Sequence, residues 1–359
     1  MTEPLPIRRH RGVVRWHQGP WLLSARGPHI ARSEDGGNSW TPLCTVPLPP
    51  SGRVRGAFRW SARLFRAQTH HIVAVGANDL VVVAHRMVYH YDLEAGRWTR
   101  PATPLCGSRP LAMCVTPEGR VYYGEYSGSR ERAPRRVLVS DDAGRTWDVA
   151  WTIRGIRHIH GVFHDSWTDA LWVTTGDDDH EAGLWCTTDR FATLDQVVGG
   201  SQRVRVVQPL FTAGAVYFGS DAPAERNGIQ RLDRRSGRVE VVHPVDGPVF
   251  YGCQAGDWLF FSTVCEPSRV NTDRHAVVWG SPGGEWWLRV ACFAKDWLSA
   301  RLFQYGQVLF PAGPGGYPWL WLSPLGTEGD QTSLCYDISQ WAAADRPREA
   351  GGSKAVARP

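Results

Sequence analysis

Two short stretches of the chain carry the same pattern and decide the fold: SEDGGNSW at Ser33–Trp40 and SDDAGRTW at Ser140–Trp147. Both contain an Asp, a Gly two residues later, and a final Ser-Trp or Thr-Trp pair. Asp and Gly are typical turn residues, because the Asp side chain accepts hydrogen bonds from nearby amides and Gly tolerates positive φ. A Trp directly after such a turn can anchor a hairpin by packing against its strands. We therefore predict that the Asp and Trp of each stretch are structural residues in the turns of β-hairpins.

Weaker copies of the pattern recur along the chain at intervals of about 45 to 60 residues. The six copies end at Trp40, Trp98, Trp147, Leu194, Val239 and Trp286. Between them lie short β-branched or aromatic runs such as DLVVVAH, ALWVTTG and WLFFSTV, bounded by turn residues. About four strands per repeat indicate an all-β propeller. A final unit from about Trp297 to Ser339 raises the count to seven four-stranded blades, with six as the alternative.

The two intact stretches resemble Asp boxes, and most of the chain is similar to the sialidase-like, Asp-box (BNR-repeat) β-propeller superfamily. The resemblance implies that each box joins the third and fourth strands of a blade and that its Asp bonds turn amides. The Phe-Arg-Ile-Pro signature of sialidases is absent, and the nearest text is SARLFRAQ. The resemblance is therefore specific for the fold and says little about chemistry, because unrelated functions share one fold.

Composition narrows the class of protein. Of the 359 residues 42% are hydrophobic, which suffices for one large core, and the net charge of +5 comes from arginines scattered among acids. Without a basic stripe we expect no nucleic-acid partner, and without a long apolar run no membrane span. The N-terminus MTEPLPIRRHRGVVRW lacks the apolar segment of a signal peptide, so we expect a cytoplasmic protein.

We expect a leader at 1–12, a single propeller domain at 13–341 and a disordered tail at 342–359. The leader either adds a strand to the last blade or is loose.

Blade geometry predicts where chemistry-bearing residues gather. In each blade the first strand starts, and the second strand ends, on the face opposite the boxes, because neighbouring strands are antiparallel. The predicted second strands end at polar residues on this rim, namely His85, Glu125, Tyr126, Asp177, Asp221 and Glu266. The predicted first strands bring basic residues to the same rim, namely Arg66 or His70, Arg157, His158, Arg205, Lys295 and Arg301. Four carboxylates facing a ring of cations indicate a ligand site more readily than chance turn residues do.

The stretch GIRHIHGVFHD at 155–165 supplies the central candidates. Residues at i and i+2 share one face of a strand, so His158 and His160 should point the same way. They are candidates for catalysis, for substrate contact, or for holding a divalent metal ion together; no other cofactor is expected. Alternatively, one of them bonds a neighbouring backbone group in an ordinary way.

Three further residues complete the predicted catalytic set. Glu125 and Tyr126 adjoin each other at a strand end, where a Tyr beside a carboxylate can serve as nucleophile or acid. Lys295 is the single lysine of the predicted blades, and unlike Arg a buried Lys can lose its proton. Tyr251 is a candidate for stacking on a sugar.

Several functions fit these residue types. We expect a carbohydrate-active enzyme acting on an acidic glycan or glycosylated small molecule of the uronate or sialate kind, with β-elimination favoured over hydrolysis. An arginine would neutralise the substrate carboxylate, and His, Tyr or Lys would move protons. The alternatives are an enzyme that modifies an intracellular metabolite and a non-catalytic ligand-binding or scaffolding propeller. The oligomeric state does not follow from the sequence.

Overall fold

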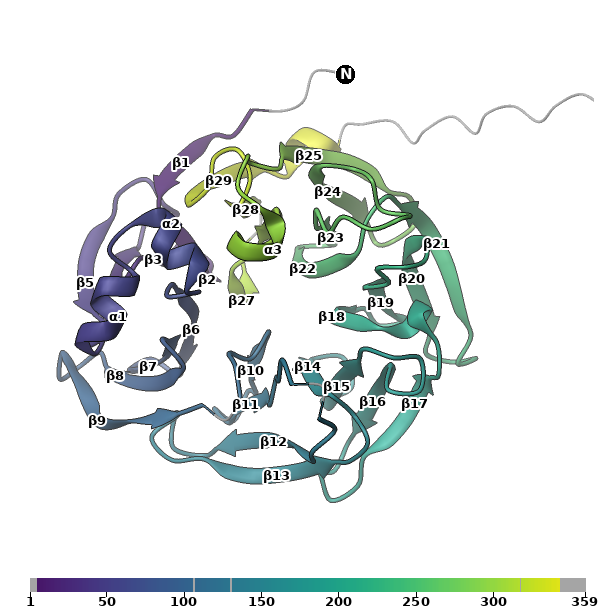
Figure 1. Ribbon diagram of the computed structural model, residues 1–359, viewed down its shortest axis with the longest axis horizontal. Helices are drawn as coiled ribbons and strands as arrows, with labels where there is room; N and C mark the ends of the chain where they lie inside the picture. Colours follow the sequence, from purple (N-terminus) through teal and green to yellow (C-terminus); the bar gives the residue numbers. More distant parts are fainter. Residues whose placement is uncertain (1–4, 106, 130, 317, 343–359) are drawn as a thin grey trace, which may run out of the picture.

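The computed structural model of the chain describes residues 5–105, 107–129, 131–316 and 318–342. Most of the expected tail, and residues 1–4 of the expected leader, lie outside these ranges. Seven sheets stand around a central axis as the blades of a β-propeller (Figure 1). The predicted fold and its seven blades are confirmed. Among the described residues, no helix is long and apolar enough to cross a membrane.

The blades follow one another in chain order, and in blades 1 to 6 the first strand lies nearest the axis. Blade 1 contains β2 (Val13–Gln18), β3 (Trp21–Arg26), β4 (His29–Ser33) and β5 (Thr41–Thr45), with β27 (Ala312–Gly315) added beside β2. Blades 2 and 3 contain β6 (Thr69–Val75), β7 (Asp79–Ala84), β8 (Met87–Asp92) and β9 (Arg97–Pro104), then β10 (Met113–Val115), β11 (Val121–Gly124), β12 (Arg135–Ser140) and β13 (Asp148–Ile153). Blades 4 and 5 contain β14 (His158–Asp165), β15 (Ala170–Gly176), β16 (Gly183–Thr187) and β17 (Asp195–Gly199), then β18 (Val206–Phe211), β19 (Ala215–Ser220), β20 (Asn227–Asp233) and β21 (Val239–Val245). Blade 6 contains β22 (Val249–Ala255), β23 (Trp258–Thr263), β24 (His275–Pro282) and β25 (Leu288–Ala294).

The N-terminus closes the ring. Blade 7 consists of β26 (Gln307–Leu309), β28 (Trp319–Leu325), β29 (Thr332–Asp337) and, as its outermost strand, β1 (Arg8–Arg11). β1 pairs antiparallel with β29 from Arg8 opposite Cys335 to Arg11 opposite Thr332. Of the two possibilities for the leader, its last residues therefore add a strand to the final blade, which joins the two ends of the propeller by backbone hydrogen bonds.

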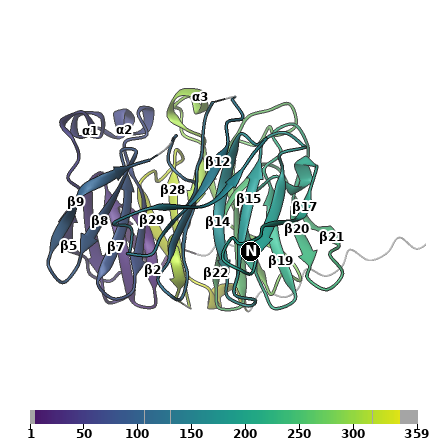
Figure 2. The ribbon, with the colours of Figure 1, turned by 90° about the horizontal axis from the view of Figure 1, so that it is seen from below.

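The short helices mark one face of the disc. α1 (Pro50–Arg55), α2 (Arg59–Leu64) and α3 (Ala300–Phe303) lie on the same face in the side view (Figure 2). A short 3-10 helix, η1 (Gln202–Val204), precedes β18, and α4 (Ser339–Ala342) follows blade 7. Because α1 and α2 lead into the start of β6, this is the face on which first strands begin and second strands end.

The predicted box turns join third and fourth strands, as the resemblance implies. Asp35 lies between β4 and β5 and accepts a hydrogen bond from the Ser39 amide at 2.9 Å. Asp142 lies between β12 and β13 and accepts from the Thr146 amide at 2.8 Å. The weaker copy at Asp189 makes the same bond to the Thr193 amide at 2.9 Å. The Asp of these turns is therefore structural, as predicted.

One position of the turn holds Gly in an intact box and a large residue in the weaker copy. Gly144 has φ 87°, and a Cβ on it would lie 2.7 Å from a Val81 methyl carbon, so a larger residue does not fit. In the copy at Thr187–Leu194, Phe191 adopts φ 71° at this position and is buried against Tyr122, with ring centroids 5.7 Å apart. Burial of an aromatic ring offsets the strain of a positive φ there.

Candidate functional site

Two clusters of charged and titratable side chains lie where the sequence predicted ligand contacts. The rim cluster consists of Arg157, His158, His160, Asp177, Arg205 and Asp221, on the face that carries α1 to α3. The channel cluster consists of Arg15, His70, His71, Arg109 and Tyr251, which line the central cavity. That cavity holds about 540 Å³ and is lined by residues from the innermost strands of all seven blades. A larger cavity of about 870 Å³ lies beside α1, and its lining includes Arg26, His29, Arg53 and Arg59.

The two histidines of the rim cluster are buried and bonded to each other. Both are 2% exposed, and their Nε2 atoms lie 3.1 Å apart. His158 Nδ1 lies 3.0 Å from the carbonyl oxygen of Ser127, and His160 Nδ1 lies 2.7 Å from that of Val206. Alternation along β14 places both rings on one face, as predicted. A ligand in the channel does not reach them directly in this arrangement.

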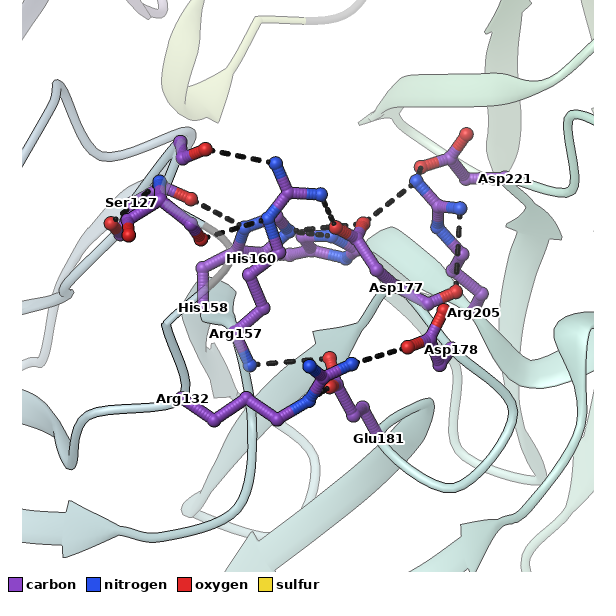
Figure 3. A network of polar contacts seen from close by, with 12 residues as sticks. Ser127, Arg132, Arg157, His158, His160, Asp177, Asp178, Glu181, Arg205 and Asp221 are labelled. Atoms are coloured by element: carbon purple, nitrogen blue, oxygen red, sulfur yellow. Dashed lines mark hydrogen bonds and ion pairs between the residues drawn. The ribbon is translucent and has the colours of Figure 1, made fainter.

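Asp177 is the hub of the rim cluster (Figure 3). Its carboxylate pairs with Arg157 and, at 2.9 Å, with Arg205, and one of its oxygens lies 3.3 Å from His158 Nε2. Burial opposes ionisation, but the bond from His158 and the charges of His158 and Arg205 together hold the pKa of Asp177 well below its usual range. This carboxylate is therefore ionised and neutralised by its neighbours.

Asp221 behaves in the opposite way. It lies 3.1 Å from Arg205, is 3% exposed, and one of its carboxylate oxygens has no hydrogen-bond partner among the described residues. Burial raises the pKa of Asp221 to about 8, outweighing the charge of Arg205, while Glu266 and Asp177 raise it further. Burial also lowers the pKa of His160 to about 3, so this ring is neutral.

Three partly exposed residues, Tyr126, Glu266 and Tyr305, lie near these buried groups. The Tyr126 ring stacks on His158 with centroids 4.1 Å apart, and burial raises its pKa to about 12. Burial also raises the pKa of Glu266, whose carboxylate accepts a hydrogen bond from Tyr305. A raised pKa suits Glu266 to a general acid or base role, whereas Tyr126 keeps its proton at neutral pH and can donate it in a hydrogen bond.

The channel cluster contains two arginines without an acidic partner. Arg15 and Arg109 are partly exposed to the cavity, and the ionisable neighbours that act on them within the described ranges are each other, Arg66, His70, His71, Tyr126 and Tyr251. Arg15 Nε is buried with no hydrogen-bond partner in that part of the chain. Burial lowers the pKa of Arg15 to about 10, and the charge of Arg109 lowers it further. Both guanidinium groups remain charged at neutral pH.

The histidines beside them add no charge. Burial lowers the pKa of His71 to about 4 and that of His70 well below its ordinary value, with the arginine charges acting in the same direction. Each ring also bonds a backbone carbonyl, His70 that of Arg66 and His71 that of Pro110. The positive potential of the cavity therefore comes from the arginines.

The structure brings together only part of the predicted set. Arg157, His158, His160, Asp177, Arg205 and Asp221 form the rim cluster, and Tyr126, Tyr251, Glu266, His70 and the exposed Arg66 adjoin the channel. Glu125 does not join them, because Arg136 holds its carboxylate by the backbone amide at 2.9 Å and by Nε at 2.8 Å.

Three other predicted residues also lie apart. The side chain of Lys295 is 6% exposed and donates to Asp296 and, at 2.7 Å, to the carbonyl of Leu298. His85 packs beside α1, and Arg301 is an exposed residue of α3.

Sequence reasoning missed Arg15 and Arg109. Arg15 stands in the middle of β2, between apolar residues, and Arg109 lies in the segment leading into β10. A charged residue within an otherwise apolar inner strand was the available signal for Arg15. Arg109 had no such signal, because its position follows only from the path of the loop.

Comparisons with known proteins support the propeller fold and indicate no function. No family model and no curated protein sequence matches this chain. Among solved structures, a chain of a mitotic checkpoint complex is 13% identical with a TM-score of 0.59, over 93% of this chain and 92% of that one. YCF48 bound to a D1 peptide is 11% identical with a TM-score of 0.56, over 94% and 99%. The extracellular domain of a hybrid two-component system of B. thetaiotaomicron is 12% identical with a TM-score of 0.56, over 92% of this chain and 39% of that chain.

Proposed function

We propose that this propeller binds an acidic, hydroxylated small molecule of the uronate or sialate kind in its central channel and cleaves it by acid–base chemistry. The observation that carries the proposal is the pair Arg15 and Arg109, which face the cavity with no described carboxylate beside them. Partly buried guanidinium groups are costly without a partner, so an anionic ligand would supply the missing charge.

The partly exposed Tyr126 and Glu266 would transfer the protons of the cleavage reaction. In a β-elimination, a base removes the proton next to the substrate carboxylate, the carbon–oxygen bond one carbon further on breaks, and an acid protonates the leaving oxygen. Tyr126 and Glu266 supply an acid and a base, and the arginines stabilise the charge that develops on the carboxylate. The buried His158 and His160 would position Tyr126 and not contact the substrate.

Calorimetric titration tests the binding step. D-Glucuronate and N-acetylneuraminate are compared with the uncharged D-glucose and with the methyl ester of N-acetylneuraminate. We expect only the anions to bind, and Arg15→Met and Arg109→Met each to weaken binding by at least about tenfold, since a hydrogen bond to a charged group is worth about 1.5–3 kcal/mol. Arg235→Met, at an exposed turn residue, is the matched control and should leave affinity unchanged. Equal binding of the neutral analogues would refute the proposal.

Product analysis tests the cleavage step. Acidic oligosaccharides are incubated with the protein, and the products are weighed by mass spectrometry. Elimination yields products whose masses sum to that of the substrate and which absorb in the ultraviolet, whereas hydrolysis adds one water. We expect Tyr126→Phe and Glu266→Gln to abolish the reaction while retaining binding.

The second candidate function is non-catalytic binding, favoured by the burial of both histidines away from the channel. YCF48, a propeller of similar fold, is bound to a D1 peptide in its solved structure, so a propeller of this shape can hold a peptide. Binding of the anions with no product of either mass would select this function.

A further inference from the structure

Three atoms that can each bind a metal ion converge in the rim cluster. His158 Nε2 lies 3.1 Å from His160 Nε2 and 3.3 Å from a carboxylate oxygen of Asp177, and the three residues present their ligand atoms within 4.8 Å of one another. Figure 3 shows the two rings and the carboxylate directed toward one another.

The tautomers of both rings follow from their backbone partners. A carbonyl oxygen only accepts, so the Nδ1 atoms bonded to the carbonyls of Ser127 and Val206 must carry the hydrogens. A metal ion is bound by the neutral form of imidazole, and in that form each ring presents a lone pair at Nε2. Two lone pairs and a carboxylate oxygen repel one another unless a positive species lies between them.

We propose that His158, His160 and Asp177 form a binding site for a divalent first-row transition metal ion. A metal–ligand bond of about 2.1 Å converts the 3.1 Å between the two Nε2 atoms into an angle of about 95° at the metal. The same bond length converts the 3.3 Å between His158 and Asp177 into an angle of about 105°. Both angles suit a three-ligand site that retains open positions.

A shared proton explains these distances less well. A proton on one Nε2 could bridge the two rings, but the bond to Asp177 would then be long, because charge-assisted N–H···O bonds are typically about 2.7–2.9 Å. A proton on His158 Nε2 would also have to be shared between two acceptors, His160 Nε2 and the Asp177 carboxylate. A metal ion contacts all three.

The donor set and its surroundings indicate the kind of metal. Two imidazoles and one carboxylate suit Zn²⁺, Fe²⁺, Co²⁺ or Ni²⁺ and are poor ligands for Mg²⁺ or Ca²⁺. Each imidazole donates its other nitrogen to a backbone carbonyl, the usual outer contact of a metal-bound histidine. Arg205 and Arg157 pair with Asp177 and hold it in place.

A neighbouring group of possible ligands is already occupied. Asp178, His180 and Glu181 also lie within reach of one ion, but Arg132 pairs with both carboxylates. We therefore assign the metal to the buried group alone.

The test is metal titration of the full chain after treatment with a chelator. Zn²⁺ is titrated by calorimetry, Co²⁺ by its visible absorption, and Mg²⁺ serves as the negative control. We expect one Zn²⁺ per chain, no Mg²⁺ binding, and at least about tenfold weaker Zn²⁺ binding in His160→Ala and in Asp177→Asn, because even outer-shell changes cost that much. His164→Ala, on the same strand, and His180→Ala should bind Zn²⁺ like the unaltered chain.

Zinc-edge X-ray absorption of the unaltered chain supplies a measurement that does not depend on whether a variant folds. It should show two imidazole ligands and oxygen donors. Failure to bind Zn²⁺, unchanged affinity in folded His160→Ala and Asp177→Asn, or loss of binding in His180→Ala would each overturn the assignment. A proton on Nε2 that persists in the nitrogen NMR spectrum at saturating Zn²⁺ would do the same.

Discussion

The rim cluster and the channel cluster each contain two arginines, but only the rim arginines have acidic partners. Arg157 and Arg205 share Asp177, and Arg205 also reaches Asp221. The ionisable neighbours of Arg15 and Arg109 within the described ranges are each other, Arg66, two histidines and two tyrosines, none of them an acidic side chain that pairs with them. The arginines of the rim cluster are thus paired with carboxyl groups of the fold, whereas the channel cluster is a concentration of unpaired positive charge. Charges that the fold neutralises stabilise it, and charges that it leaves unpaired are available to a ligand.

A large effect should come from removing the hub of the rim cluster. Asp177→Ala leaves two guanidinium groups and His158 without their carboxylate, and we expect a loss of about 3–5 kcal/mol in the free energy of unfolding. Asp178→Ala is the control, because that side chain is 58% exposed; its pair with Arg132 should contribute less than about 1 kcal/mol. Urea denaturation measures both. Equal losses would mean that the rim cluster is no framework.

A pH titration of stability should reveal the protonated carboxyl of Asp221. Its pKa of about 8 in the folded chain exceeds the ordinary value of 3.8, so between these values the folded chain keeps a proton that the unfolded chain has lost. The free energy of unfolding should therefore fall as pH rises through this window and level off above it. Each tenfold difference in proton affinity is worth about 1.4 kcal/mol.

The comparison with Asp221→Asn isolates this contribution from other titrating groups. The variant carries no titrating carboxyl, so its stability should lack that decline. Denaturant unfolding at a series of pH values gives the difference between the two chains. Parallel curves would show that Arg205 keeps Asp221 ionised.

The smallest effect on the free energy of unfolding should come from a substitution in the channel cluster, and it tests the comparison most directly. Arg109→Met removes one of two neighbouring cations, and we expect the free energy of unfolding to stay constant or to rise by up to about 1 kcal/mol. The expected rise is small because the side chain is partly exposed and solvent screens its charge. Arg205→Met in the rim cluster should instead destabilise the chain. If Arg109→Met were the more harmful of the two, the division into a paired framework and an unpaired binding site would fail.

Much of the fold could be predicted because its determinants are local. The box turns depend on residues within eight positions of one another, and their recurrence sets the number of blades. Strand polarity then places Arg157, His158, Asp177, Arg205 and Asp221 on one rim, where the structure has them.

What each side chain does there could not be predicted in the same way. Glu125 and Asp177 both follow a second strand, but the bonds from Arg136 occupy Glu125 within its own blade, while Asp177 receives cations from two blades. That difference depends on how neighbouring strands are rotated and on which cationic side chain lies within bonding distance of each carboxylate.

The sequence by itself determined the seven-bladed propeller, its turn chemistry and the rim on which charged residues gather, because hydrogen bonds within a few residues and a regular repeat specify them. Only the tertiary structure decided that Arg15 and Arg109 meet across the channel and that His158, His160 and Asp177 converge on one point. Ring closure brings Arg15 and Arg109 together from different blades, whereas His158, His160 and Asp177 lie on or directly after adjacent strands of one blade and converge through the directions of their side chains.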